Sequence, residues 1–273
     1  MSGTRLDVHR CGGGDTRILL IHGSGSAAKP FLGLAEALIA RLSESATDSE
    51  AVAVSLAGYG STPADTHQPI VDQHLQVLRE AMDGSCWHLV GHSMGGYLAL
   101  QLALRLPDQV SSLSLIEPMA FGVLDRQRDQ DAIEADQRVI SQFAANGVAT
   151  AEGIRCFIEA WNQSSWESLP GGLRSHLTQL APLIYEEAAA VSSDQTTLAD
   201  YGELSQALLL LAGRNSPLPA QRIVERLSEL PSATSIQWLD GAGHMSVLQS
   251  PERFAASIAA HISQCAQRTP SSE

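Results

Sequence analysis

The sequence is poor in lysine, and its basic residues form no cluster. Lys29 is the only lysine, the other sixteen of the seventeen basic residues are arginines, and no basic run occurs. The thirty acidic residues leave a formal net charge of -13. Nucleic acid or an anionic membrane surface would be repelled by this charge. We therefore expect neither nucleic acid nor a membrane as partner; the pattern does not indicate an oligomeric state.

Cysteines and long apolar runs are also scarce. Cys11, Cys86, Cys156 and Cys265 lie far apart, without the spacing of a zinc site or a disulfide framework. No apolar run reaches the roughly 20 residues of a membrane span, and the N-terminus lacks the apolar stretch of a signal peptide. We expect a cytoplasmic protein with free thiols and no metal site.

Short apolar runs alternate with amphipathic stretches, which is typical of parallel strands covered by helices. The pattern predicts an α/β fold with a mainly parallel twisted sheet and helices on both faces. The predicted strands are residues 6–9, 18–21, 51–56, 87–90, 110–116, 207–211 and 235–239. The predicted helices are residues 31–42, 70–82, 94–106, 219–230 and 251–265. Residues 121–202 show helical patterns only, which indicates an inserted subdomain, and residues 268–273 are expected to be a disordered tail.

The segment Gly91-His92-Ser93-Met94-Gly95 matches the G-x-S-x-G pattern between a predicted buried strand and a predicted helix. The two glycines let the strand and the helix approach closely, and the sharp turn lifts the serine hydroxyl above the sheet. The pattern therefore predicts Ser93 as a nucleophile.

A His-Gly loop, residues 22–26, follows the predicted strand 18–21. The intermediate of acyl transfer carries negative charge on an oxygen, which needs two preorganised donors. We predict that the backbone N–H groups of Ser24 and Met94 form this oxyanion hole. The glycine spacing also resembles a dinucleotide-binding fingerprint, but its candidate acids, Glu44 and Asp48, precede the next strand instead of ending it.

Serine is a weak nucleophile at neutral pH and needs a base within hydrogen-bond reach. His244, in the Gly-Ala-Gly-His segment after the last predicted strand, is the predicted base. His22 and His92 border the two loops and are expected to hold them by hydrogen bonding. The remaining histidines are expected to be ordinary solvated side chains: His9, His67, His74, His88, His176 and His261.

These motifs, together with the Leu-Ala-Gly-Tyr-Gly-Ser segment at residues 56–61, resemble the α/β-hydrolase superfamily over nearly the whole chain. The resemblance implies a hydrolase core over residues 1–120 and 203–273, a helical cap over residues 121–202, and no cofactor. The cap would set the substrate, and its aromatic residues Phe143, Trp161 and Trp166 are predicted to line an apolar cavity above the nucleophile.

The sequence departs from this superfamily at the acid that orients the base. In most members an Asp follows the penultimate strand, but here Ser216 stands at that position. A minority of members carries the acid one strand earlier, where this chain has Glu117. We predict Glu117 as the third catalytic residue, with a carboxylate oxygen within about 3.2 Å of a His244 ring nitrogen. Asp240, a cap carboxylate, or a site without any acid are the alternatives.

The resulting functional prediction is a serine hydrolase that cleaves carboxylic esters of small or medium apolar substrates through an acyl-enzyme. Hydrolysis of a carbon-carbon bond in a diketone-like compound uses the same residues in related proteins and stays open as an alternative. A binding or receptor-like member with little turnover is the second alternative, which the missing Asp keeps open.

Overall fold

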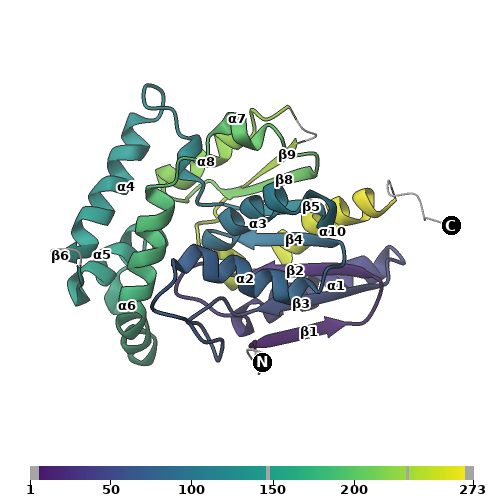
Figure 1. Ribbon diagram of the computed structural model, residues 1–273, viewed down its shortest axis with the longest axis horizontal. Helices are drawn as coiled ribbons and strands as arrows, with labels where there is room; N and C mark the ends of the chain where they lie inside the picture. Colours follow the sequence, from purple (N-terminus) through teal and green to yellow (C-terminus); the bar gives the residue numbers. More distant parts are fainter. Residues whose placement is uncertain (1–5, 146–147, 232–233, 268–273) are drawn as a thin grey trace.

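The computed structural model describes residues 6–145, 148–231 and 234–267 and has an α/β architecture (Figure 1). Its main sheet has seven strands in the order β1-β3-β2-β4-β5-β8-β9. β1 pairs antiparallel with β3, whereas the other pairs of this sheet are parallel, so the predicted mainly parallel sheet is confirmed. The strands are β1 Val8–Gly12, β2 Thr16–Ile21, β3 Ser49–Val54, β4 Trp87–His92, β5 Val110–Ile116, β8 Ala207–Gly213 and β9 Thr234–Leu239.

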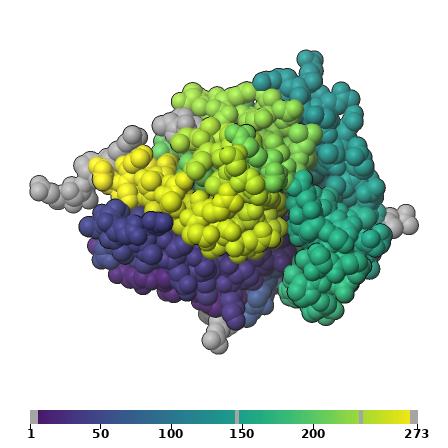
Figure 2. Space-filling model, turned by 180° about the vertical axis from the view of Figure 1, so that it is seen from behind, coloured from purple at the N-terminus to yellow at the C-terminus, as the bar shows by residue number. Residues whose placement is uncertain are grey.

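Helices cover both faces of the sheet because successive strand residues point to opposite sides. Ile18 and Leu20 of β2 pack with α1 and α10, whereas Leu19 and Ile21 join the core with α2, α3 and α8. Figure 2 shows the C-terminal α10, in yellow, beside α1. The helices are η1 Lys29–Phe31, α1 Leu32–Glu44, α2 Ile70–Met82, α3 Met94–Arg105, η2 Pro107–Gln109, α8 Leu218–Leu227, α9 Ser246–Gln249 and α10 Glu252–Ala266.

The segment between β5 and β8, residues 121–202, is called the insertion below, and its three longest helices gather beside the sheet in Figure 1. The helical-only expectation was wrong at one point, because β6 and β7 form a two-residue antiparallel pair that is too short for a strand pattern in sequence. The elements of the insertion are η3 Phe121–Val123, α4 Gln130–Phe143, β6 Ala144–Ala145, β7 Val148–Ala149, α5 Ala151–Asn162, η4 Trp166–Ser168, α6 Gly171–Ser192 and α7 Leu198–Tyr201.

The element boundaries agree with the sequence patterns to within a few residues. The strand expected at 110–116 and the helix expected at 70–82 match β5 and α2. The first strand, expected at residues 6–9, lies later, at Val8–Gly12. Gly12 has φ +79°, yet it still pairs with Glu50 of β3.

Three further sequence-based expectations concern membrane-spanning helices, the thiols and the C-terminal tail. Within the described ranges, no helix combines the length and the apolar character needed to cross a bilayer. All four cysteines lie in these ranges and none forms a disulfide. The tail expected at residues 268–273 falls outside the described residues.

A buried carboxylate on α6 ties the insertion to the loops of the sheet. Glu187 Oε1 lies 2.7 Å from His74 Nε2 of α2, and Glu187 Oε2 accepts a hydrogen bond of 2.8 Å from the Tyr59 hydroxyl. The Tyr59 oxygen accepts one in turn from the Gly25 N–H, at 3.0 Å, in the His-Gly loop. Both Glu187 and His74 have fully buried side chains. The insertion is therefore fastened to the loop that follows β2.

Two histidines expected to be solvated are buried instead. His74 pairs with Glu187, and the His88 ring nitrogen Nδ1 lies 2.8 Å from Ser112 Oγ on β5. Burial lowers the pKa of His88 to about 4, so its ring is neutral at pH 7. The expectation was wrong because both partners are distant in sequence.

Glu187→Ala should lower the free energy of unfolding by about 3–5 kcal/mol, the cost of breaking a buried pair by removing one member. His74 and Tyr59 would both lose their acceptor. The free energy of unfolding is measured in urea, with Glu186→Ala as the control, because Glu186 is the exposed neighbour on the same helix. The control should stay within about 0.5 kcal/mol of the parent. Equal stability of the two variants would contradict the expectation.

Candidate active site

The loops after β2 and β4 meet at the carboxyl edge of the sheet. From β2 the chain crosses to β3 on one side, then returns to β4 on the other side of β2. Ligands of open α/β sheets bind at such a switch point. Glu44 and Asp48, the candidate acids of a dinucleotide site, lie ahead of β3 and so at its opposite end.

Ser93 occupies a strained turn between β4 and α3. Its backbone has φ +55° and ψ -120°, a conformation that L-residues rarely adopt. A Cβ on Gly91 would lie 2.3 Å from the Gly95 carbonyl oxygen, and one on Gly95 would lie 2.1 Å from the Ile21 carbonyl oxygen. Only glycine fits at either position, which explains the spacing of the motif.

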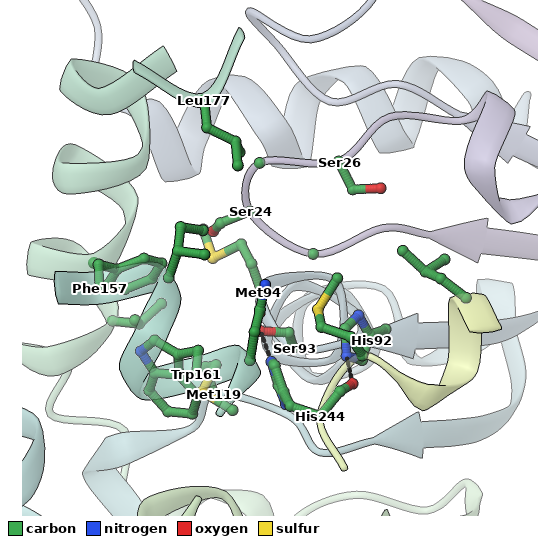
Figure 3. A pocket seen from close by; sticks show the side chains of 18 of the residues that line it. Ser24, Ser26, His92, Ser93, Met94, Met119, Phe157, Trp161, Leu177 and His244 are labelled. Carbon is green, nitrogen blue, oxygen red and sulfur yellow. Dashed lines mark hydrogen bonds between the residues drawn. The ribbon is translucent and has the colours of Figure 1, made fainter. Parts of the chain in front are cut away.

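Three side chains from separate strand ends form one chain of hydrogen bonds. His244 Nε2 lies 3.1 Å from Ser93 Oγ, and His244 Nδ1 lies 2.6 Å from Glu117 Oε2. Figure 3 shows Ser93 and His244 facing each other across the first of these contacts. The second distance lies inside the limit of about 3.2 Å expected for an orienting acid. All three residues are buried.

The Glu117 carboxylate is held by further donors on its other oxygen. Oε1 accepts hydrogen bonds from the Gly213 N–H at 2.7 Å and from Ser216 Oγ at 2.5 Å. Burial alone would raise the pKa of this carboxyl, but His244, Gly213 and Ser216 together hold the pKa below its ordinary value. Glu117 is therefore ionised at neutral pH.

Asp240, the alternative acid, lies elsewhere. Its side chain is 92% exposed and forms an ion pair of 2.8 Å with Arg214 Nε. Asp240 lies in the loop after β9. Among the described residues it forms no hydrogen bond with the His244 ring, whose Nδ1 faces Glu117 instead. The structure does not support Asp240 as the partner of the histidine.

The predicted oxyanion donors lie beside Ser93. Ser24 and Met94 both line the cavity that contains Ser93. Met94 is the first residue of α3, so its N–H has no acceptor within the helix. The His-Gly loop is held by a hydrogen bond from the Ser26 N–H to the Gly23 carbonyl, at 3.2 Å, besides the one from Gly25 to Tyr59.

His22 and His92 hold loops, as their positions predict. His22 Nε2 accepts from the Leu56 N–H at 3.0 Å, so its Nδ1 donates to the Gly23 carbonyl at 2.8 Å. His92 Nε2 lies 2.9 Å from the carbonyl oxygen of His244 and thus supports the loop of the base. Burial lowers the pKa of His22 to about 4 and that of His92 to about 3. Both rings are neutral at pH 7.

Comparison with known proteins identifies the family. Residues 18–257 match the family model described as the alpha/beta hydrolase family. The chain belongs to the alpha/beta hydrolase family. Seen within this family, Ser216 stands where an Asp is common, and its hydroxyl donates to Glu117, the acid at the end of the preceding strand of the sheet.

Individual relatives of this alpha/beta hydrolase are distant. It is 25% identical over 272 residues to the dihydrolipoyllysine-residue acetyltransferase component of the acetoin cleaving system of Cupriavidus necator, covering 96% of this chain and 67% of that protein. It is 27% identical to a pimeloyl-[acyl-carrier protein] methyl ester esterase of Pectobacterium atrosepticum, over 91% of this chain and 95% of the relative. A hydrolase from Pseudomonas aeruginosa PA01 shares the fold, with a TM-score of 0.73 and 18% identity over 94% of each chain.

A cavity of about 330 Å³ lies between Ser93 and the insertion of this alpha/beta hydrolase. Trp161 lines it as predicted, with its ring centroid 5.2 Å from that of His244. Figure 3 shows further apolar side chains around Ser93, among them Met119, Phe157 and Leu177. No motif predicted these residues: Met119 lies in the loop after β5, and nothing in the sequence marks which faces of α5 and α6 meet the site.

Phe143 and Trp166 do not line the cavity, and their predicted role was wrong. Both belong to the insertion's own hydrophobic core. Phe143 is fully buried and stacks on Phe157 at a centroid distance of 4.9 Å. An aromatic residue in an inserted helix either packs the insertion or faces the site, and the sequence pattern is the same in both cases.

An acidic side chain also lines the cavity of this alpha/beta hydrolase. Asp136, on α4, is only 6% exposed, and burial raises the pKa of its carboxyl to about 6. The Ser192 hydroxyl, at the end of α6, opposes the rise. Asp136 was missed because it sits in an ordinary amphipathic helix pattern without a motif.

Asp136→Asn should raise the free energy of unfolding at pH 8, by up to about 3 kcal/mol. A folded-state pKa near 6 lies above the usual 3.8, so ionisation of this carboxyl opposes folding. That cost appears as pH rises through the interval between the two pKa values and is complete above pH 6. The gain should therefore shrink toward zero at pH 4. Urea unfolding at both pH values measures it.

Glu134→Gln is the matched control for this measurement, because Glu134 lies on the same helix and is exposed. Its effect should be small and should not depend on pH in this way. A stability gain for Asp136→Asn that is equally large at pH 4 and pH 8 would show that ionisation is not its cause.

Proposed function

We propose that this protein is a serine hydrolase that cleaves carboxylic esters through an acyl-enzyme on Ser93. One arrangement carries the proposal: the hydrogen-bonded series from Ser93 Oγ through the His244 ring to the Glu117 carboxylate. Membership of the alpha/beta hydrolase family and an esterase among the relatives support hydrolase activity.

The geometry suits acyl transfer step by step. His244 Nε2 accepts the Ser93 proton as Oγ attacks the ester carbonyl, and the Nδ1–H donates to Glu117, which stabilises the imidazolium. The N–H groups of Ser24 and Met94 are the proposed donors to the oxyanion. His244 then gives the proton to the leaving alcohol, and a water activated in the same way releases the acid.

The cavity favours a small or medium substrate with apolar parts, because most of its lining side chains are apolar. The binding-protein alternative depended on the absence of an acid at Ser216, and Glu117 supplies a carboxylate in that network. Carbon-carbon bond hydrolysis would use the same residues, so a diketone-like compound belongs in the same assay panel.

Ser93→Ala should abolish hydrolysis of a short-chain aryl ester while leaving the fold unchanged, because it removes only the attacking oxygen. The parent should show a burst of released alcohol and should be labelled by a fluorophosphonate, and the variant should show neither. Circular dichroism checks the fold. Parent-level turnover by Ser93→Ala would contradict the proposal, and melting shifts by the ester without turnover in the parent would indicate a binding protein.

Glu117→Gln should lower kcat on the order of 10⁴-fold, because the amide cannot stabilise the imidazolium and favours the wrong tautomer. Ser216→Ala is the control at the same carboxylate. It removes one neutral donor to Oε1 and should cost about tenfold or less. Steady-state kinetics with the same aryl ester measures both. A fully active Glu117→Gln variant would rule out this role for Glu117.

A further inference from the structure

Two polar side chains from different helices of the insertion line the apolar cavity together. Asp136 projects from the middle of α4 and Ser192 from the last residue of α6. Among the described lining residues, Asp136 is the only acidic side chain and none is Lys or Arg. The other polar lining residues of the insertion, Asn162 and His176, are half-buried and exposed, so water can solvate them.

Asp136 interacts with Ser192, but no ion pair holds either of them among the described residues. Ser192 Oγ is buried and lies close enough to the Asp136 carboxyl to lower its pKa, although the two groups form no well-directed hydrogen bond. On the same segment of chain, Asp129 and Asp131 pair with Arg226 and Arg222, and no such ion pair is formed to Asp136 by the described residues. Asp136 also lies inside its helix, where it cannot cap the first turn.

A buried carboxylate whose one polar neighbour among the described residues is a hydroxyl is costly, and an apolar side chain of similar size would pack the same position at no such cost. Buried polar groups usually have all their hydrogen-bond partners, so an incompletely satisfied pair needs an explanation. Asp136 and Ser192 line the same cavity as Ser93, where a bound ligand can supply the missing partner. The partner must donate, because an ionised carboxylate can only accept hydrogen bonds. Ser192 can donate to Asp136 or accept from the same ligand group.

We propose that Asp136 and Ser192 form a recognition subsite for a hydrogen-bond donor, a hydroxyl or a protonated amine, on the substrate part remote from the scissile bond. This inference rests on the proposed function, since Ser93 and Asp136 line one cavity and a single ligand can reach both. The preferred substrate is then an apolar ester with one terminal donor, and a purely hydrocarbon ester is a poorer ligand.

Binding without turnover tests the subsite apart from catalysis. Three esters of equal chain length are used: ethyl hexanoate, ethyl 6-hydroxyhexanoate and ethyl 6-aminohexanoate. They are titrated at pH 8 into the Ser93→Ala protein, and the dissociation constants are measured by calorimetry. The two donor-bearing esters should bind about 10- to 100-fold tighter than ethyl hexanoate, the range for a hydrogen bond to a charged group.

Variants in the same Ser93→Ala background assign the effect. Asp136→Leu should remove the preference for both donors. Asp136→Asn keeps an acceptor oxygen but not the charge, so it should remove the preference for the amine and only reduce that for the hydroxyl. Glu134→Gln, on the exposed face of α4, should change neither. Circular dichroism checks that each variant folds. If Asp136→Leu does not fold, the test is whether Asp136→Asn loses the preference for the amine ester.

The proposal is overturned if ethyl hexanoate binds as tightly as both donor esters, or if the preference survives Asp136→Leu. It is equally overturned if Asp136→Asn retains the full preference for the amine. Hydrolysis of the three esters by the parent protein separates the two proposals. Selective binding without hydrolysis of any ester would leave the subsite standing and reject the ester hydrolase.

Discussion

The arrangement of the site depends on one buried negative charge, the Glu117 carboxylate. A charge inside a protein is tolerated only when its hydrogen-bonding capacity is filled, and removing one partner is strongly destabilising. Here the donors come from the chain after β8, through Gly213 and Ser216, and from the loop after β9, through His244. One carboxylate at the end of β5 thus fixes two neighbouring strand ends and aims the imidazole at Ser93.

The same interaction explains how Ser216 fits into this hydrogen-bonded network. Two carboxylates at this place would repel each other unless one bound a proton. With the acid at Glu117, the position after β8 needs a small donor, and a serine hydroxyl fills that need at 2.5 Å. Ser216, in place of the common Asp, therefore complements Glu117, because its hydroxyl donates to the carboxylate.

Residues placed by strand patterns could be predicted from the sequence, whereas residues placed by the packing of segments distant in sequence could not. Ser93, His244 and Glu117 each follow a strand of the parallel part of the sheet, and the carboxyl ends of parallel strands share one edge, so the strand patterns bring them together. The lining of the cavity was not predictable in this way. Phe143 and Trp161 lie in similar amphipathic helices, and only the packing of α4, α5 and α6 sends one into the core of the insertion and the other over His244. The pair of His74 and Glu187, 113 residues apart, was hidden for the same reason.

The insertion carries two buried carboxylates whose surroundings differ in kind. Glu187 receives a hydroxyl hydrogen bond and faces a histidine, and through Tyr59 it reaches the Gly25 N–H of the loop that carries Ser24. Asp136 lies in a largely apolar cavity, where the Ser192 hydroxyl is its polar neighbour. A satisfied buried charge fastens one element to another, whereas an unsatisfied one lowers stability until something binds. The insertion therefore combines a fixed attachment to the loop that carries Ser24 with an incompletely satisfied acceptor in the cavity beside Ser93. Binding of a hydrogen-bond donor at that acceptor would return stability that folding alone does not provide.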